Sequence, residues 1–292
     1  MGSTVVTRRW PPPAGTSEDV DVWQEEYFVD FTTQSSGAIA HNATTNLGTR
    51  FDGGSAPAWL AEEDNSGDDN DDIGTLEWVS GQGLKATPIQ DASNSNLHDS
   101  IDAPCLSVEL DECMPTLTNR DVICVQVFVG EPVTIAADHD GYGIVLYKPA
   151  SDLTSVVDFV YMRNYHASST RKWRVAGKGG AGTQADAAGG ISEVPAMIEI
   201  VLYPGGHAVC STSASSSVTQ KPLSSTLNRG WCRSDPAQLN AHGSFSEPSW
   251  TLDKSTMRLG LVSYKHASGT SFYTYFKKVR ILRLAGKDGG LD

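Results

Sequence analysis

Residues 75–87 have the sequence TLEWVSGQGLKAT, in which two short strand-type segments flank the glycine-containing turn SGQG. Apolar side chains that alternate with polar ones are typical of a strand with one buried face, and glycine next to a polar residue favours a tight turn. The stretch therefore predicts an antiparallel hairpin, and the rest of the chain follows the same pattern.

Outward from this hairpin, strand-type segments recur along the chain. Residues 121–129 form a nearly continuous run of β-branched and apolar residues, which suits a central strand. Residues 142–147 and 156–163 predict a second hairpin, and 196–202 and 207–211 predict a third across the turn YPGG. Further strands are predicted at 27–31, 105–110, 172–175, 257–264 and 272–284.

The connections between these segments are long, and no persuasive amphipathic helix interrupts them. Residues 32–58, 88–103, 176–192 and 212–250 are predicted to be loops. Short strands separated by Gly, Pro and Ser turns favour an all-β sandwich or barrel. We predict an all-β, two-sheet antiparallel jelly-roll sandwich over residues 25–285, with an extended Pro-rich arm at 1–24 and a short tail at 286–292.

Composition narrows the classes of function. The chain has 292 residues and a net charge of −13, whereas proteins that bind nucleic acid usually present a basic face. No apolar run reaches the ~18 residues that span a bilayer, and the first nine residues lack the apolar segment of a signal peptide. These features predict a protein made in a cytoplasm, with neither nucleic acid nor membrane as a partner.

The order of the segments resembles concanavalin A-like lectin/glucanase domains. The resemblance rests on Val29-Asp30-Phe31, the Trp78 to Lys85 hairpin, the Tyr142 to Tyr147 strand and the closing segments Arg258 to Val262 and Tyr275 to Ile281. It covers residues 25–285 and lies in pattern rather than in a diagnostic motif. It implies two antiparallel sheets, one concave, with binding or catalysis on the concave face or in the rim loops.

One motif of that superfamily is present in incomplete form. Laminarinase-like glucanases carry Glu-x-Asp-x-Glu on a strand, where alternation puts the carboxylates on one face. Here Glu109 and Asp111 match, whereas Cys113 occupies the third position, and Glu112 would point to the opposite face of an ideal strand. A β-bulge would be needed for Glu109 and Glu112 to act as a retaining pair, so we predict that the chain has no catalytic residues.

The acidic segment 62–72 holds seven carboxylates in eleven residues. Hard cations bind several oxygen ligands, so calcium bound by Asp64, Asp68, Asn70 and Asp72 is one interpretation. The spacing is not that of an EF-hand, and a solvated loop without any cofactor is the other interpretation.

Aromatic residues lie in predicted loops and at strand ends, where sugar rings stack. A glycan-binding platform is predicted at Tyr161, Tyr165, Trp173 and Trp231, and Trp250, Tyr264 and Tyr273 share this setting. Core or interface packing is the alternative for each of them.

The N-terminal arm contains Arg8-Arg9-Trp10-Pro11-Pro12-Pro13, and the three prolines favour an extended conformation. Trp10 is a natural interface anchor. The favoured hypothesis is therefore a non-catalytic structural protein, a virion component such as a capsid decoration or tail-associated protein, whose arm docks on neighbouring subunits of a homo-oligomeric assembly. A glycan-binding lectin-like module is the alternative, followed by a retaining glycoside hydrolase.

The five cysteines show no CxxC spacing, which leaves metal knuckles and thioredoxin-type chemistry without support. Cys124, inside the 121–129 run, is predicted to be a small buried hydrophobe. Disulfides between Cys105 and Cys113 or between Cys210 and Cys232 are alternatives to free buried thiols.

Overall fold

The computed structural model describes strand segments across the whole of the predicted sandwich. The described residues are 22–62, 74–89, 103–118, 121–130, 141–149, 156–167, 170–179, 183–186, 196–202, 208–213, 242–245, 256–265 and 272–285. Across these residues no helix has the length and apolar character needed to cross a membrane.

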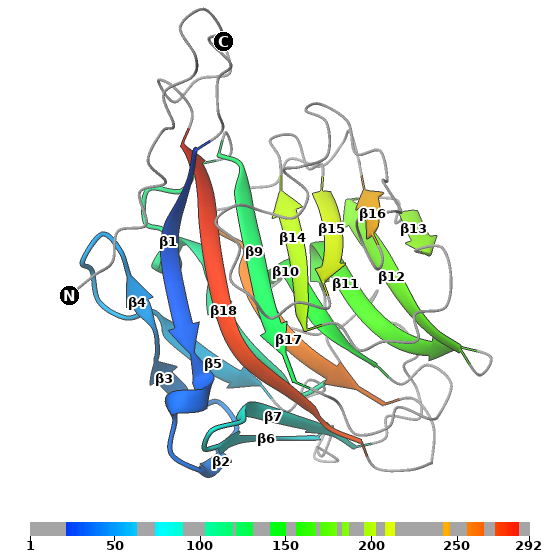
Figure 1. Ribbon diagram of the computed structural model, residues 1–292, viewed down its shortest axis with the longest axis horizontal. Helices are drawn as coiled ribbons and strands as arrows, with labels where there is room; N and C mark the ends of the chain where they lie inside the picture. The colour runs from blue at the N-terminus through cyan, green and yellow to red at the C-terminus, as the bar shows by residue number, and fades with distance from the viewer. Residues whose placement is uncertain are drawn as a thin grey trace, which may run out of the picture.

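Most of these residues lie in two antiparallel sheets that face each other (Figure 1). Sheet A is ten-stranded. Its order is β16 (His242–Phe245), β15 (Ala208–Ser213), β14 (Met197–Leu202), β9 (Ile123–Val129), β18 (Thr274–Ala285), β7 (Gly83–Pro88), β6 (Gly74–Val79) and β2 (Gly37–Ile39), with β1 (Val22–Asp30) paired to β18 and β4 (Thr49–Arg50) paired to β1.

Sheet B is eight-stranded and lies behind sheet A in Figure 1. Its order is β13 (Thr183–Asp186), β12 (Thr170–Gly179), β11 (Val156–Ala167), β10 (Gly141–Pro149), β17 (Arg258–Tyr264), β8 (Cys105–Glu109), β5 (Ala58–Glu62) and β3 (Thr44–Asn46). Two short helical elements have described bounds, η1 (Phe31–Thr33) and α1 (Leu110–Cys113). The predicted fold class, an all-β antiparallel two-sheet jelly-roll sandwich, is confirmed.

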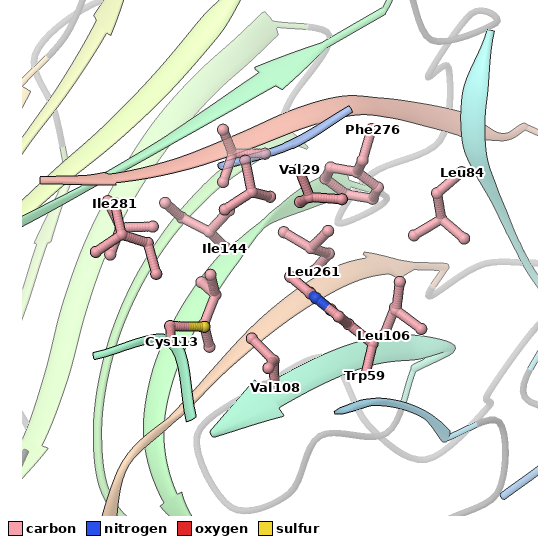
Figure 2. Packing of buried hydrophobic residues seen from close by; sticks show 14 of the residues in the cluster. Val29, Trp59, Leu84, Leu106, Val108, Cys113, Ile144, Leu261, Phe276 and Ile281 are labelled. Atoms are coloured by element: carbon pink, nitrogen blue, oxygen red, sulfur yellow. The ribbon is translucent and has the colours of Figure 1, made fainter. Parts of the chain in front are cut away.

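The core fills the space between the two sheets. Figure 2 shows Phe276 and Leu84 of sheet A above Leu261, Leu106 and Trp59 of sheet B. All five side chains are at most 1% exposed. Burial of this apolar surface is the main force that holds the sheets together, at ~25 cal/mol per Å² removed from water.

The hairpins predicted from the sequence are all present. β6 pairs with β7, β10 with β11 and β14 with β15, each in antiparallel register. In the β6–β7 hairpin Gly83 has φ +108°, and a Cβ there would lie 2.4 Å from the carbonyl oxygen of Phe276. Glycine is therefore needed at position 83 both for the backbone angle and for the approach of β18.

The extent of several elements differs from the prediction. The loops expected at 176–192 and 212–250 contain the short strands β13 and β16. Residues 32–58 were expected to form a loop, but they contain β2, β3 and β4, which are two- or three-residue strands too short to produce a readable alternation. The strand expected at 172–175 is longer, because Thr170–Gly179 pairs over its whole length with β11.

The outer face of sheet A carries a polar network between apolar neighbours. Arg280 on β18 lies 3.1 Å from the Glu25 carboxylate on β1, and Gln126 on β9 donates to Glu199 on β14 at 2.8 Å. Arg280, Gln126 and Glu199 are at most 2% exposed. Beside them, Trp23 packs in a second apolar cluster whose other buried members are Val122, Cys124, Val201 and Leu282. This face explains why β9 has a nearly continuous apolar sequence, since both of its faces are buried.

β18 organises sheet A and leads to the candidate site. It is bordered by β9 along one side and, along the other, by β7 at its beginning and by β1 at its end. In Figure 1 the beginning of β18 lies beside β7 and β6 at the lower edge of the molecule. Side chains on the outer face of these three strands therefore stand next to one another.

Candidate site on the outer face of sheet A

A row of three polar side chains crosses the beginning of β18. Tyr275 lies directly opposite Lys85 on β7, and Lys85 lies opposite Glu77 on β6. Their chain neighbours Phe276 and Leu84 are buried in the core, so strand alternation places the row on the outer face. All three side chains of the row are partly exposed.

Tyr273 joins this row and completes a compact group. The Tyr273 and Tyr275 rings have centroids 5.3 Å apart and meet edge to face at 74°. The Lys85 ammonium lies 4.7 Å from the centroid of the Tyr273 ring and 2.6 Å from a carboxylate oxygen of Glu77. Cross-strand ion pairs and aromatic pairs of this kind fix side chains on a sheet surface. Glu77, Lys85, Tyr273 and Tyr275 are called the tyrosine patch below.

The charges in the patch support one another at neutral pH. The hydrogen bond to Glu77 raises the pKa of Lys85, so the ammonium stays protonated. Burial raises the pKa of the Tyr275 phenol and the nearby Tyr273 phenol raises it further, against the opposing effect of Lys85. Lys85 and Tyr275 therefore keep their protons at neutral pH, and the patch presents an ammonium and a carboxylate beside two phenol rings.

This combination is suited to binding a polar ligand that also has an apolar face. Aromatic rings pack against apolar C–H surfaces, while hydroxyl, ammonium and carboxylate groups exchange hydrogen bonds with hydroxyl groups. Glu77 is the single carboxylate of the patch and is ion-paired to Lys85. A pair of carboxylates for acid–base catalysis is thus not part of this arrangement.

The structure corrects the interpretation of the Glu109 motif. Residues 110–113 form the helical turn α1, so Glu109 and Asp111 do not alternate along one strand. The physical reason is that Leu110 and Cys113, three residues apart, are both buried, which a helical turn achieves and an extended strand does not. The Met114 amide donates to the Leu110 carbonyl at 2.9 Å and closes the turn.

Each of two carboxylates in this region has a structural partner. Arg258 on β17 donates to Glu109 at 2.9 Å and to the Ser107 hydroxyl at 3.1 Å. Glu112 accepts a hydrogen bond of 2.6 Å from the backbone amide of Ala58, at the start of β5. Glu112 therefore ties α1 to the neighbouring strand.

The cysteine predictions are resolved for three of the five residues. Cys105, Cys113 and Cys124 are buried and form no disulfide, so the Cys105–Cys113 bridge is not formed. Burial raises the pKa of the Cys113 and Cys124 thiols well above its ordinary value, which keeps them protonated and unreactive. The side chain of Cys210 and all of Cys232 lie outside the described residues.

Most residues of the other predicted sites lie outside the described part of the chain. These are Arg8, Arg9, Trp10, Pro11, Pro12 and Pro13 of the arm, Asp64, Asp68, Asn70 and Asp72 of the acidic segment, and Trp231. Among the residues that are described, no group of three or more His, Cys, Asp or Glu side chains is arranged to hold a metal ion.

The predicted aromatic platform is described only in its backbone. Tyr161 and Tyr165 on β11 are in register with Ala176 and Lys172 on β12, and Trp173 is in register with Asn164. Their side chains lie outside the described residues.

Tyr264 and Tyr273, which were also predicted to lie in loops or at strand ends, differ in solvent exposure. Tyr264 is buried at 4% exposure, whereas Tyr273 is partly exposed and belongs to the tyrosine patch. Tyr275 was not singled out, although its spacing of two from Tyr273 is the signal that both share one face of a strand. The contribution of Lys85 and Glu77 depends on the register between β18 and β7, which no local pattern reveals.

Several solved structures of known proteins are distantly similar to this chain in fold. No protein-family model and no curated protein matches the sequence. A botulinum neurotoxin type C structure, described for cell entry that depends on two ganglioside molecules, is similar with a TM-score of 0.44 and 10% identity, over 87% of this chain and 49% of that chain. The chain thus spans about half the length of the neurotoxin structure that it matches.

Two alginate lyases are similar over most of both chains. The first, alginate lyase AlyC3 in complex with dimannuronate, has a TM-score of 0.39 and 8% identity, over 88% of this chain and 92% of that one. The second, from Pseudomonas aeruginosa, has a TM-score of 0.36 and 8% identity, over 90% and 98%. Similarity at this level does not bear on ligand or activity, which have to be argued from the residues of the chain itself.

Proposed function

We propose that this chain is a non-catalytic binding protein that recognises a glycan through the tyrosine patch. The observation that carries the proposal is the pair of partly exposed rings, Tyr273 and Tyr275, held at 5.3 Å beside the Lys85–Glu77 ion pair. A sugar has an apolar C–H face for a ring and a rim of hydroxyl groups for the charged pair. The patch offers both within one cross-strand row.

The position of the patch on the sheet favours affinity. Its four side chains stand on or beside the paired strands β6, β7 and β18, whose backbones are fixed by their ladders. Tyrosine has only two side-chain torsions, so little conformational entropy is lost when a ring is immobilised by a ligand. A preorganised surface of this kind loses less free energy on binding than a mobile loop would.

A binding role without catalysis is supported by the use of the carboxylates on α1 and β8. Retaining glycosidases need two free carboxyl groups about 5–5.5 Å apart. Here Glu109 is paired with Arg258, and Glu112 is engaged with the Ala58 amide. Either side chain would have to break this bond before it could act as a nucleophile or as an acid–base residue.

The proposal is tested by a glycan array probed with the native chain, Tyr275→Ala and Phe28→Ala. Phe28 is a matched control, because it is another partly exposed aromatic residue of sheet A, on β1 and outside the patch. Native protein and Phe28→Ala are expected to bind the same glycans, and Tyr275→Ala is expected to lose at least about tenfold in affinity, equivalent to ~1.4 kcal/mol. Equal binding by all three proteins, or binding by none, contradicts the proposal.

A second proposed function is assembly into a larger particle such as a virion. What supports it is the sequence of the arm, in which Trp10 precedes three prolines. Trp23, which follows the arm in the chain, belongs to the apolar cluster on the outer face of sheet A. Deletion of residues 1–20 is expected to leave the sandwich folded and to abolish co-assembly. A truncated chain that folds and co-assembles normally would remove this function.

A further inference from the structure

β18 contains one extra residue next to the tyrosine patch. Phe276 is opposite Val129 and Lys278 is opposite Phe128 on β9, so Lys277 has no partner across the ladder. β-Bulges of this kind often lie beside functional sites, where they redirect a side chain.

The bulge puts two consecutive lysines on the outer face. Phe276 is buried in the core, so alternation directs its neighbours Tyr275 and Lys277 outward. Lys278 also faces outward, because it forms an ion pair of 3.0 Å with Asp30, which is partly exposed on β1. A regular strand would have turned one of the two lysines toward the core.

Gly130 makes room for this arrangement. Its amide donates to the Tyr275 carbonyl at 2.8 Å, just beyond the end of β9. A Cβ at Gly130 would lie 2.9 Å from Cβ of Tyr275 and 3.0 Å from Cε of Lys277. The Lys277 stem therefore crosses the bare backbone of Gly130 and is held beside Tyr275, and any larger residue at position 130 would displace it.

Within the described part of the chain, Lys277 is the one lysine on this face of β18 and β7 that forms no ion pair. Lys85 is paired with Glu77, and Lys278 is paired with Asp30. No described residue forms an ion pair with Lys277. The chain as a whole carries a charge of −13, so acids are plentiful. A partly exposed lysine that is held in place without an ion pair to a described acid, as Lys277 is, is therefore unexpected.

We infer that the ligand of the tyrosine patch is an acidic sugar, whose ring lies against Tyr275 and whose carboxylate is bound by Lys277. The inference rests on the proposed glycan-binding function and names the class of glycan. Lys277 is thereby a specificity-determining residue, and Gly130 and the bulge are the features that position it.

The test uses carboxylated glycans, both uronic and sialic, each arrayed beside its methyl ester. The ester keeps the ring and the shape and removes the charge. Native protein is expected to bind the acids about tenfold more tightly than the esters, and to lose that preference as salt is raised, because exposed charges are screened beyond ~10 Å at 0.1 M salt. Lys277→Met is expected to bind acid and ester equally, at the level at which native protein binds the ester.

Two control variants separate the inference from the function on which it rests. Lys278→Met removes a charge from the same face and is expected to keep the preference for acids, whereas Tyr275→Ala is expected to weaken the binding of acids and esters alike. Equal binding of acids and esters by native protein, or an unchanged preference in Lys277→Met, overturns the acidic-sugar inference and leaves glycan binding standing. Absence of binding to any glycan on the array overturns both.

Discussion

Replacement of Tyr27 by phenylalanine tests how the two sheets are locked together. Tyr27 on β1 is fully buried, and its hydroxyl donates to the Leu47 carbonyl at 2.8 Å. The same hydroxyl accepts a hydrogen bond of 2.7 Å from the indole N–H of Trp59 on β5. One oxygen atom thus connects sheet A to sheet B inside the apolar core.

The magnitude follows from what Tyr27→Phe leaves behind. Phenylalanine keeps the ring and its packing, so the cavity is no larger than one oxygen atom. The Trp59 donor and the Leu47 acceptor lose their partner in a site without solvent, and each unsatisfied buried group costs about 1–3 kcal/mol. For the two groups together we expect the free energy of unfolding to fall by about 2–6 kcal/mol, a large fraction of the 5–15 kcal/mol typical of a domain.

Urea unfolding followed by tryptophan fluorescence measures this loss, with the m-value compared between proteins to verify that only stability has changed. Tyr273→Phe is the matched control, since it removes the same hydroxyl from a partly exposed ring on the surface and is expected to change stability by less than about 0.5 kcal/mol. A Tyr27→Phe loss below about 1 kcal/mol, or one equal to that of the control, would refute the role given to the buried hydroxyl.

Three further predictions concern positions elsewhere in the sandwich. Gly48 has φ +84° and a Cβ there would lie 2.4 Å from the Tyr27 hydroxyl, so Gly48→Ala is expected to destabilise by about 2 kcal/mol or more in the same urea assay, and a neutral result would contradict the close approach. Arg280→Met leaves the largely buried Glu25 carboxylate without its cation and is expected to cost about 3 kcal/mol; a stabilised variant would show instead that an apolar residue suits this face better. Burial would raise the pKa of Asp30, but hydrogen bonds from Thr32 and Lys278 outweigh burial and lower the pKa. These bonds therefore stabilise the fold at pH values above the ordinary aspartate pKa, and the stabilisation is lost as the pH falls through the lowered pKa. The stability difference between native protein and Asp30→Asn should therefore be present at pH 6 and vanish in strong acid, and a difference that persists there would be inconsistent with the lowered pKa.

The fold was predictable where local signals and burial agree. The hairpin at 75–87 could be recognised because Gly83 is required by the turn and Leu76 and Leu84 mark the buried face. The run at 121–129 could be recognised as a central strand because β9 is buried on both faces. In these strands burial or turn geometry constrains nearly every residue, so the alternating or continuous apolar pattern can be read from the sequence.

The prediction failed where a short element depends on its neighbours. Glu109 and Asp111 look like two positions on one face of a strand, but burial of Leu110 and Cys113 requires a helical turn. The three-residue strands β2 and β3 exist because β6 and β5 pair with them, and a segment of that length has no periodicity of its own.

The tyrosine patch illustrates the part that local sequence cannot supply. The sequence identifies Tyr273 as an aromatic residue in a predicted loop or at a strand end, with glycan binding or packing as its possible roles. The rest of the site comes from the pairing of Tyr275 with Lys85 and of Lys85 with Glu77, between strands far apart in the chain. Only the register of β18 against β7 brings these side chains together.

The central claim is that the tyrosine patch is a glycan-binding surface. Calorimetric titration of the best-bound array glycan into native protein, Tyr275→Ala and Phe28→Ala tests it most directly. The account predicts that native protein and Phe28→Ala give the same dissociation constant, and that Tyr275→Ala raises that constant at least about tenfold while its unfolding curve stays unchanged. Equal dissociation constants for native protein and a folded Tyr275→Ala variant would contradict the claim.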